Sequence, residues 1–200
     1  MVAPPYRIVT PRLVIRCWEP RDAPLLKNAL DTSLDHLHAW MPWAREEPKP
    51  LEAKVELLRL FRGKFDLDQD YVYGMFSPDE GEALGGSGLH TRVGDDALEI
   101  GYWIRASATR QGIATETAAA LTRVAFELCG VDRVELHIDP ANEASLGVPR
   151  NLGFTEEATL RRRLPVARDM VVFTLFRDEV PAPIAAAALQ AYDAAGSRVL

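Results

Sequence analysis

The sequence predicts a single α/β domain, with a mixed, mostly antiparallel sheet of seven strands and helices on both faces. Three observations predict this class. Strand and helix patterns follow one another along the 200 residues in the order β-α-α-α-β-β-β-α-β-α-β-β. Hydrophobic residues make up 48% of the chain and charged residues 26%, which suits one compact core. A long helix joins the fourth and fifth strands, so that pair is expected to be parallel through a right-handed crossover.

The first third of the chain is predicted to be one strand followed by three helices. Residues 12–18 alternate well enough to form the strand. Asp22 can cap a helix over residues 22–30, and a second short helix is expected over about 32–42. Apolar side chains then recur at helical spacing over residues 51–66, which predicts an amphipathic helix.

The middle of the chain is predicted to be a meander of three strands. These strands cover residues 71–76, 84–91 and 97–104. The segment Ser77–Gly81 has a proline and a glycine where turns favour them, and Gly94–Asp96 makes a tight hairpin.

A long helix is predicted over residues 113–129, with Gly130 as a left-handed C-terminal stop. A fifth strand follows over residues 133–138, and a short helix over residues 142–151 ends at Gly153. The long helix is the crossover connection that makes the fourth and fifth strands parallel.

The last two strands are predicted over residues 154–159 and 170–177, joined by a basic segment around residues 161–168. Prolines at positions 181 and 183 then separate an alanine-rich helix, roughly residues 184–194, from the sheet. No internal repeat and no second domain is expected.

The bulk composition argues against several classes of protein. A formal net charge of −6 is unlike the basic face of nucleic-acid-binding proteins, so no nucleic acid is expected as a partner. Cys17 and Cys129 are the two cysteines and lie in apolar segments, which predicts a reducing, cytoplasmic location. The sequence shows no signal peptide and no membrane-spanning stretch, so no membrane partner is expected. The four histidines are scattered, and no metal is expected.

The stretch Glu99–Thr115 (EIGYWIRASATRQGIAT) joins a strand, a polar loop and the start of the long helix. The first N–H groups of a helix lack internal partners, and the helix macrodipole adds positive potential there. Gly112 and Ala114 would let a phosphate approach that backbone closely. The loop therefore predicts an anion site.

Three separated motifs resemble the GNAT superfamily of acyl-CoA-dependent N-acyltransferases, and within it the RimJ/RimL-type acetyltransferases. The segment Thr10–Arg16 (TPRLVIR) is similar to that group's opening strand. The sequences EIGYWI at residues 99–104 and GIATE at residues 112–116 resemble its central strand and helix start. The sequences NEAS at residues 142–145 and NLGF at residues 151–154 resemble its ending.

The resemblance covers roughly residues 6–180 and implies transfer of an acetyl group from acetyl-CoA directly to a primary amine. The amine would be a protein N-terminal α-amine or a small amine. We therefore assign one acyltransferase domain to residues 1–180 and a helical tail to residues 181–200. The resemblance also implies that the fourth and fifth strands splay apart after Ile104 to bind the pantetheine arm, and that the protein is a homodimer.

The resemblance further implies roles for individual residues. Glu99 would be the general base, for which a partly dehydrated carboxylate with a raised pKa is suited, and Ser145 would help the thiolate leave. A solvated strand glutamate and ordinary helix packing are the alternative interpretations, and Asn142 can also serve as a helix N-cap. Trp40 and Trp43 either line the acceptor pocket or cover the edge of the core. The expected cofactor contacts are Trp103, Ile104, Arg105, Arg110, Gln111, Gly112, Ile113, Ala114, Thr115 and Asn142.

The loop departs from the family pattern (Gln/Arg)-x-x-Gly-x-(Gly/Ala), because Thr109 stands at the first position. Arg110 is then the first candidate for the supporting positive charge, and Arg105 is the second. Gly101 carries no side chain on the face that it shares with Glu99, so a substrate could pass close to the backbone there.

Other functions stay open on the sequence alone. One is a catalytically silent acyl-CoA-binding or regulatory module, and another is a transferase of a larger acyl group such as succinyl. The run Arg161–Arg163 either attracts an acidic substrate or is a surface charge run. The identity of the acceptor amine is not encoded in a readable motif.

Overall fold

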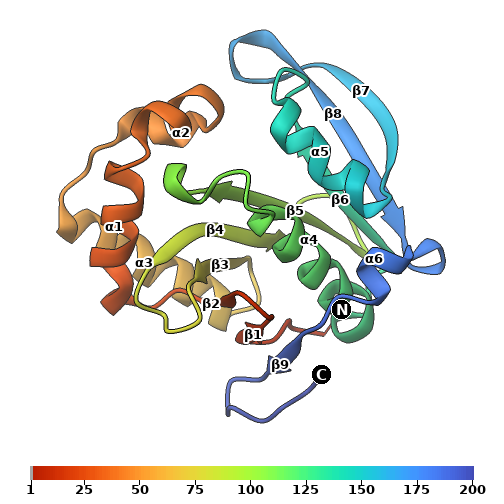
Figure 1. Cartoon of the computed structure of the whole chain (residues 1–200), viewed down its shortest axis with the longest axis horizontal. Helices are drawn as coiled ribbons and strands as arrows, with labels where there is room; N and C mark the ends of the chain where they lie inside the picture. Colours follow the sequence, from red (N-terminus) through yellow and green to blue (C-terminus); the bar gives the residue numbers. More distant parts are fainter. Residues whose placement is uncertain (1) are drawn as a thin grey trace.

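Nine strands form one twisted, open sheet in the computed structural model, which describes residues 2–200 (Figure 1). In chain order the strands are β1 (Arg7–Val9), β2 (Val14–Cys17), β3 (Tyr71–Phe76), β4 (Ala83–His90), β5 (Ala97–Ile104), β6 (Arg133–Ile138), β7 (Thr155–Leu164), β8 (Arg168–Phe176) and β9 (Gln190–Tyr192). The helices are α1 (Ala23–Asp31), α2 (Leu34–Trp40), α3 (Leu51–Asp66), α4 (Ile113–Val124), α5 (Glu143–Leu152) and α6 (Ala182–Ala185).

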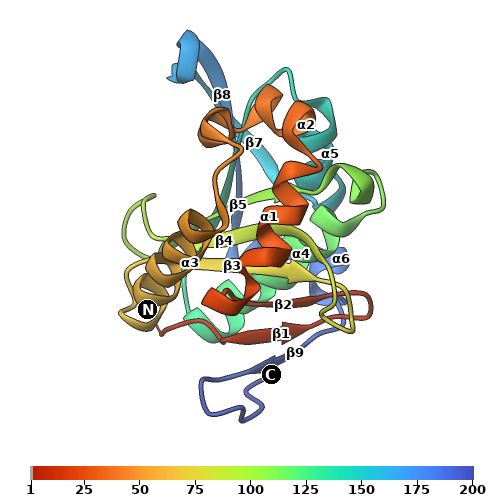
Figure 2. The same cartoon turned by 90° about the vertical axis from the view of Figure 1, so that its left-hand side faces the viewer.

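The strands lie in the order β7-β8-β6-β5-β4-β3-β2-β1-β9, and only β5 and β6 are parallel neighbours within residues 2–200. Helices α1, α2 and α3 cover one face, and α4, α5 and α6 cover the other (Figures 1 and 2). The larger apolar core lies between the sheet and α4, and a smaller one lies under α1 and α3. The predicted fold class is confirmed, with two more strands than expected. None of the helices in residues 2–200 has the length and apolarity needed to cross a membrane.

The long helix is bounded by two glycines, as predicted. Gly112 at its start and Gly130 at its end have φ angles of +78° and +75°, a left-handed conformation that glycine adopts without steric cost. Between them α4 continues into a π-helical turn over Ala125–Cys129. The short loop before α4 therefore enters the helix in a fixed direction.

The parallel pairing of β5 with β6 is short. It runs only from Ala97↔Arg133 to Glu99↔Glu135. Beyond Glu99, β5 follows its antiparallel partner β4, while β6 follows β8, and the right-handed twist of the sheet carries the two strands apart. The expectation that they part after Ile104 is wrong, because the opening begins well before that residue.

The hairpin of β7 and β8 is longer than predicted. Pairing continues to Leu164↔Arg168, so the run Arg161–Arg163 lies on a strand of a hairpin that projects from the sheet (Figure 2). The predicted loop over residues 161–168 is therefore wrong. Most side chains of β7 are exposed or half-buried, so its sequence lacks the apolar alternation that marks a half-buried strand.

The predicted helix over residues 184–194 is also wrong. Helix α6 is a single turn, and the chain then forms β9, which pairs with β1 at the edge of the sheet. Ile184 and Ala191 are fully buried in the larger core. Alanine is the best helix former, but intrinsic propensity amounts to less than about 1 kcal/mol per ordinary residue, and pairing with the free edge of β1 together with burial outweighs it. The segment after Val180 is thus not a helical tail.

Candidate active site

The parting of β5 from β6 leaves one edge of β5 open. The N–H of Arg105 donates to the carbonyl of Leu84 at 2.9 Å, and backbone groups alternate in direction along an antiparallel strand. The N–H of Trp103 therefore also faces β4, whereas the N–H groups of Tyr102 and Ile104 face the gap. Trp103, Ile104 and Arg105 were expected to bind pantetheine here, but only Ile104 has backbone groups that face the gap. The backbone of Tyr102 faces the gap as well.

The start of α5 faces β5 across this gap (Figure 1). The hydroxyl of Tyr102 lies 2.9 Å from Oγ of Ser145. Oδ1 of Asn142 accepts a 3.1 Å hydrogen bond from the N–H of Ser145, so Asn142 is the N-cap of α5. The structure therefore brings Ser145 and Asn142 together beside β5.

Tyr102 is a functional candidate that the sequence analysis missed. Burial raises the pKa of its phenol to about 12, although the hydrogen bond with Ser145 lowers it. The phenol is consequently protonated at neutral pH and can donate a proton into the gap. The sequence did contain a signal for this role, because Tyr102 belongs to the motif EIGYWI. The resemblance, however, assigned only Ser145 to the leaving thiolate.

The loop before α4 presents free N–H groups. The first helical hydrogen bond joins the N–H of Glu116 to the carbonyl of Gly112 at 2.9 Å, so the N–H groups of residues 113–115 precede it. The side chain of Gln111 donates to the carbonyl of Ser107 at 3.0 Å and braces the loop. The loop thus offers the backbone donors that the predicted anion site requires.

Arg12 supplies a positive charge at this loop, a role that the sequence analysis did not assign. Its guanidinium donates to the carbonyl of Gln111 at 2.8 Å and to Glu116 at 2.6 Å. A Cβ built on Gly112 would lie 3.3 Å from its Nη2. About half of the side chain, 54%, is exposed. The signal for this role was the arginine of the opening motif, which reaches α4 only through the tertiary fold.

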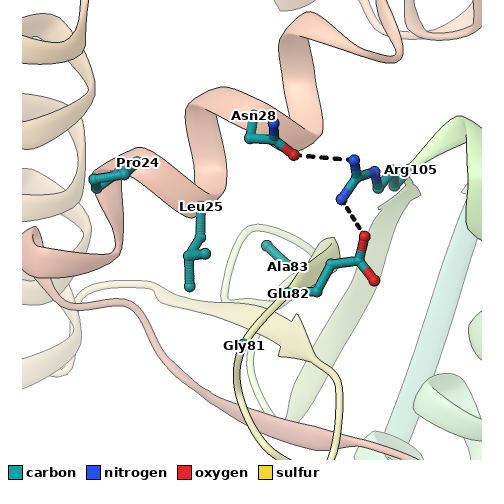
Figure 3. A pocket seen from close by; sticks show the side chains of 7 residues that line it. All are labelled: Pro24, Leu25, Asn28, Gly81, Glu82, Ala83 and Arg105. Carbon is teal, nitrogen blue, oxygen red and sulfur yellow. Dashed lines mark hydrogen bonds and ion pairs between the residues drawn. The ribbon is translucent and has the colours of Figure 1, made fainter.

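The second candidate for that charge, Arg105, points elsewhere. Its guanidinium pairs with Glu82 and donates to Asn28 at 2.9 Å, in a surface pocket between α1 and the start of β4 (Figure 3). This pocket lies on the β4 side of β5, away from the gap. Arg110, the first candidate, is exposed in the loop with a φ of +59°.

Glu99 is buried, with 5% of its surface exposed, so it is not a solvated glutamate. Arg92 donates to both of its oxygens at 2.6 and 2.7 Å, and Nδ1 of His137 lies 3.5 Å from one of them. Burial acts to raise the pKa of Glu99, but the Arg92 hydrogen bonds and the charge of His137 outweigh it and lower the pKa. The raised pKa expected for a general base is therefore not found.

The tryptophans lie on the face that α1–α3 cover. The ring centroid of Trp43 is 6.1 Å from that of Trp103 in an edge-to-face arrangement, and Trp43 is 44% exposed. A Cβ built on Gly86 would lie 2.6 Å from the indole nitrogen of Trp103, so this glycine makes room for the ring. Trp40 is the last residue of α2. The side chain of Trp103 thus faces away from α4.

Comparisons with known proteins identify the family. The family model described as an acetyltransferase (GNAT) domain matches residues 12–155. YdaF of Bacillus subtilis (strain 168), a proposed ribosomal N-acetyltransferase, is 29% identical over 86% of this chain and 94% of its own. The ribosomal protein uS5-alanine N-acetyltransferase of Escherichia coli (strain K12) is 26% identical over 77% of this chain and 80% of its own.

Solved structures agree with this assignment. RimJ of Mycobacterium smegmatis, solved in complex with CoA-disulfide, superposes with a TM-score of 0.78 over 90% of this chain and 91% of its own. At 24% identity that likeness shows the shared fold. Because the family model covers most of the sheet, the loop before α4 and α5 itself, the chain belongs to the GNAT family of acetyltransferases, with acetyl-CoA as acetyl donor.

Proposed function

We propose that this enzyme transfers the acetyl group of acetyl-CoA to the α-amine of a protein N-terminus. The observation that carries the proposal is the open edge of β5, which has the N-terminus of α4 at one end and a half-buried glycine, Gly101, along its length. The names of the two curated relatives, both ribosomal N-acetyltransferases, support a protein amine as the acceptor.

The donor site is built from backbone groups and one arginine. The N–H groups of residues 112–115 and the guanidinium of Arg12 would bind the diphosphate of the coenzyme. The N–H groups of Tyr102 and Ile104 would pair with the amide groups of the pantetheine arm, as though it were an added strand. Gln111 and Arg110 flank the diphosphate site, and Arg110 is exposed and makes no ion pair in residues 2–200, whereas Arg12 is paired with Glu116.

The acyl transfer needs three things from the protein: a base for the amine, polarisation of the carbonyl, and a proton for the departing thiolate. Tyr102 and Ser145 act as the proton donor, because they share a hydrogen bond beside the gap. Glu99 stays a candidate for the base, but its pairing with Arg92 weakens it as a proton acceptor. Trp43 and Trp103 would line the path of the acceptor.

The acceptor class is tested by measuring thiol release from acetyl-CoA in the presence of peptides. All of these peptides have the same lysine-free sequence. Peptides with a free α-amine should release thiol and gain one acetyl group by mass spectrometry, whereas the same peptides with a blocked N-terminus should not. Small amines and succinyl-CoA serve as competing substrates. Thiol release with small amines alone, and with none of the peptides, would overturn the proposed acceptor.

The role of Arg12 is tested by the affinity for acetyl-CoA. Arg12→Ala should raise the dissociation constant about tenfold, since a charge-assisted hydrogen bond to phosphate is lost. At saturating acetyl-CoA, kcat should stay close to that of the wild type. Arg59→Ala, which changes an exposed arginine of α3, is the matched control and should leave the affinity unchanged. An unchanged affinity in Arg12→Ala, together with a weakened one in Arg110→Ala, would assign the charge to Arg110 instead.

The proton donor is tested by removing the two hydroxyls. Tyr102→Phe and Ser145→Ala should each lower kcat about 10- to 100-fold with little change in the affinity for acetyl-CoA, as is usual when proton transfer is lost. Because the hydroxyls act as one unit, the double variant should be no slower than the slower single variant. Tyr192→Phe removes a hydroxyl whose one hydrogen-bond partner among residues 2–200 is Gln190, and it serves as the control. A double variant whose loss of kcat equals the product of the two single losses would contradict a shared role.

A further inference from the structure

A histidine and an aspartate form a pair on the face of the sheet that α1–α3 cover. Neither residue belongs to a motif of the sequence analysis. Nδ1 of His90 lies 2.8 Å from Oδ1 of Asp70. The two side chains are 17% and 27% exposed, so the pair is partly shielded from water but open to a substrate. His90 ends β4 and stands opposite Glu99 in the β4–β5 register.

The ring of His90 lies across two glycines. A Cβ built on Gly88 would be 2.6 Å from Nε2, and one built on Gly101 would be 3.2 Å from it. Gly101 lies just beyond Glu99, where β5 loses β6 as its neighbour. Nε2 of His90 is therefore held against the backbone of β5 where the gap opens. Glycine at both positions is what allows the ring to lie flat against the strands.

The hydrogen bond to Asp70 decides which nitrogen can take a proton. Burial raises the pKa of Asp70, but the hydrogen bond and charge of His90 and the charges of Lys64 and Arg92 outweigh this and lower it. The ionised carboxylate accepts only, so Nδ1 of His90 carries the hydrogen. The lone pair of the neutral ring is then on Nε2, and the hydrogen bonds found among residues 2–200 engage only Nδ1.

Glu99 is placed less well for the same task. Arg92 already occupies both of its oxygens, and taking a proton would break that ion pair of a buried carboxylate with a largely exposed arginine. We propose that His90, oriented by Asp70, is the general base that takes the proton of the acceptor amine. This proposal rests on the proposed amine acetylation and names a catalytic residue for it.

Nε2 of His90 takes one proton of the ammonium group, and the free amine forms the C–N bond to the acetyl carbon as the C–S bond breaks. The departing thiolate takes the proton of the Tyr102 hydroxyl. The second amine proton passes to solvent, which reprotonates Tyr102, and His90 releases its proton to solvent before the next turnover.

Several charged groups face this pair and act on its protonation. They are Arg92 after β4, Glu99 on β5, Lys64 of α3, which acts on Asp70, and His137 of β6, which acts on Glu99. A pH profile of one variant therefore reports on the whole group, so the assignment needs the histidine, aspartate and glutamate variants side by side.

The test is kcat/KM against pH for three variants with the best acceptor of the amine panel. His90→Gln should lower kcat/KM about 100-fold or more and remove the acid limb of the profile, because that limb reports protonation of the base. Asp70→Asn should move the limb to lower pH, since the carboxylate that stabilises the imidazolium is lost. Glu99→Gln should keep the limb in place. His38→Gln, at an exposed position of α2, is the control and should match the wild type.

Each variant is first shown to be folded by its rise in melting temperature with acetyl-CoA, which should equal that of the wild type. A His90→Gln enzyme that keeps the acid limb and wild-type kcat/KM would overturn the proposal, and so would a Glu99→Gln enzyme that loses the limb. If small amines are acetylated and peptides are not, the proposed acceptor is wrong. The role of His90 as general base is then tested with the small amine.

A second measurement on the wild-type protein needs no acceptor. The ¹⁵N chemical shifts of the His90 ring should show hydrogen on Nδ1 and a lone pair on Nε2 in the neutral form. The opposite tautomer, with hydrogen on Nε2, would leave no proton acceptor facing Gly101 and would overturn the proposal even if His90→Gln did not fold.

Discussion

The separation of β5 from β6 after Glu99 is the constraint on which the site depends. It arises because each strand keeps its antiparallel partner while the sheet twists, and it leaves β5 without a neighbour on one side beyond Glu99. Backbone N–H groups that would otherwise be paired within the sheet can then bind a ligand. The same opening sets Tyr102 and Ser145 on one face of β5 and the ring of His90 on the other. In the proposed mechanism, the proton donor and the proton acceptor therefore lie on opposite sides of the reacting bond.

Sequence patterns predicted most of the fold, because most elements bury one apolar face. The meander of β3, β4 and β5, the long helix between two glycines and the parallel pair were all predicted and found. The failures share a cause. The extension of β7 is exposed on both faces, and β1 and β9 are strands of only three residues near one edge of the sheet. None of these segments shows the alternation of apolar and polar residues that predicts a strand. The last segment also favours helix by composition, and only the exposed edge of β1, far away in sequence, makes it a strand.

The candidate site was predicted where its residues are contiguous. The loop at Gly112, with its free N–H groups, and the Ser145–Asn142 pair are local features of single motifs. Arg12 and His90 were missed because each acquires its role from a partner distant in sequence: Arg12 from α4, and His90 from Asp70 and Gly101. The environment of Glu99 was also beyond sequence reasoning. A strand glutamate can be solvated, desolvated or ion-paired, and the positions of Arg92 and His137, both set by the tertiary fold, lower the pKa of Glu99.

The central claim, that the open edge of β5 receives the pantetheine arm, is tested most directly by amide hydrogen exchange. The N–H groups of Tyr102 and Ile104 face the gap, whereas that of Arg105 is already bonded to Leu84. Binding of coenzyme A should slow exchange at Tyr102 and Ile104, because their N–H groups gain hydrogen-bond partners, and should leave Arg105 unchanged. Exchange at Tyr102 and Ile104 that stays as fast in the saturated complex as in the free protein would contradict the account.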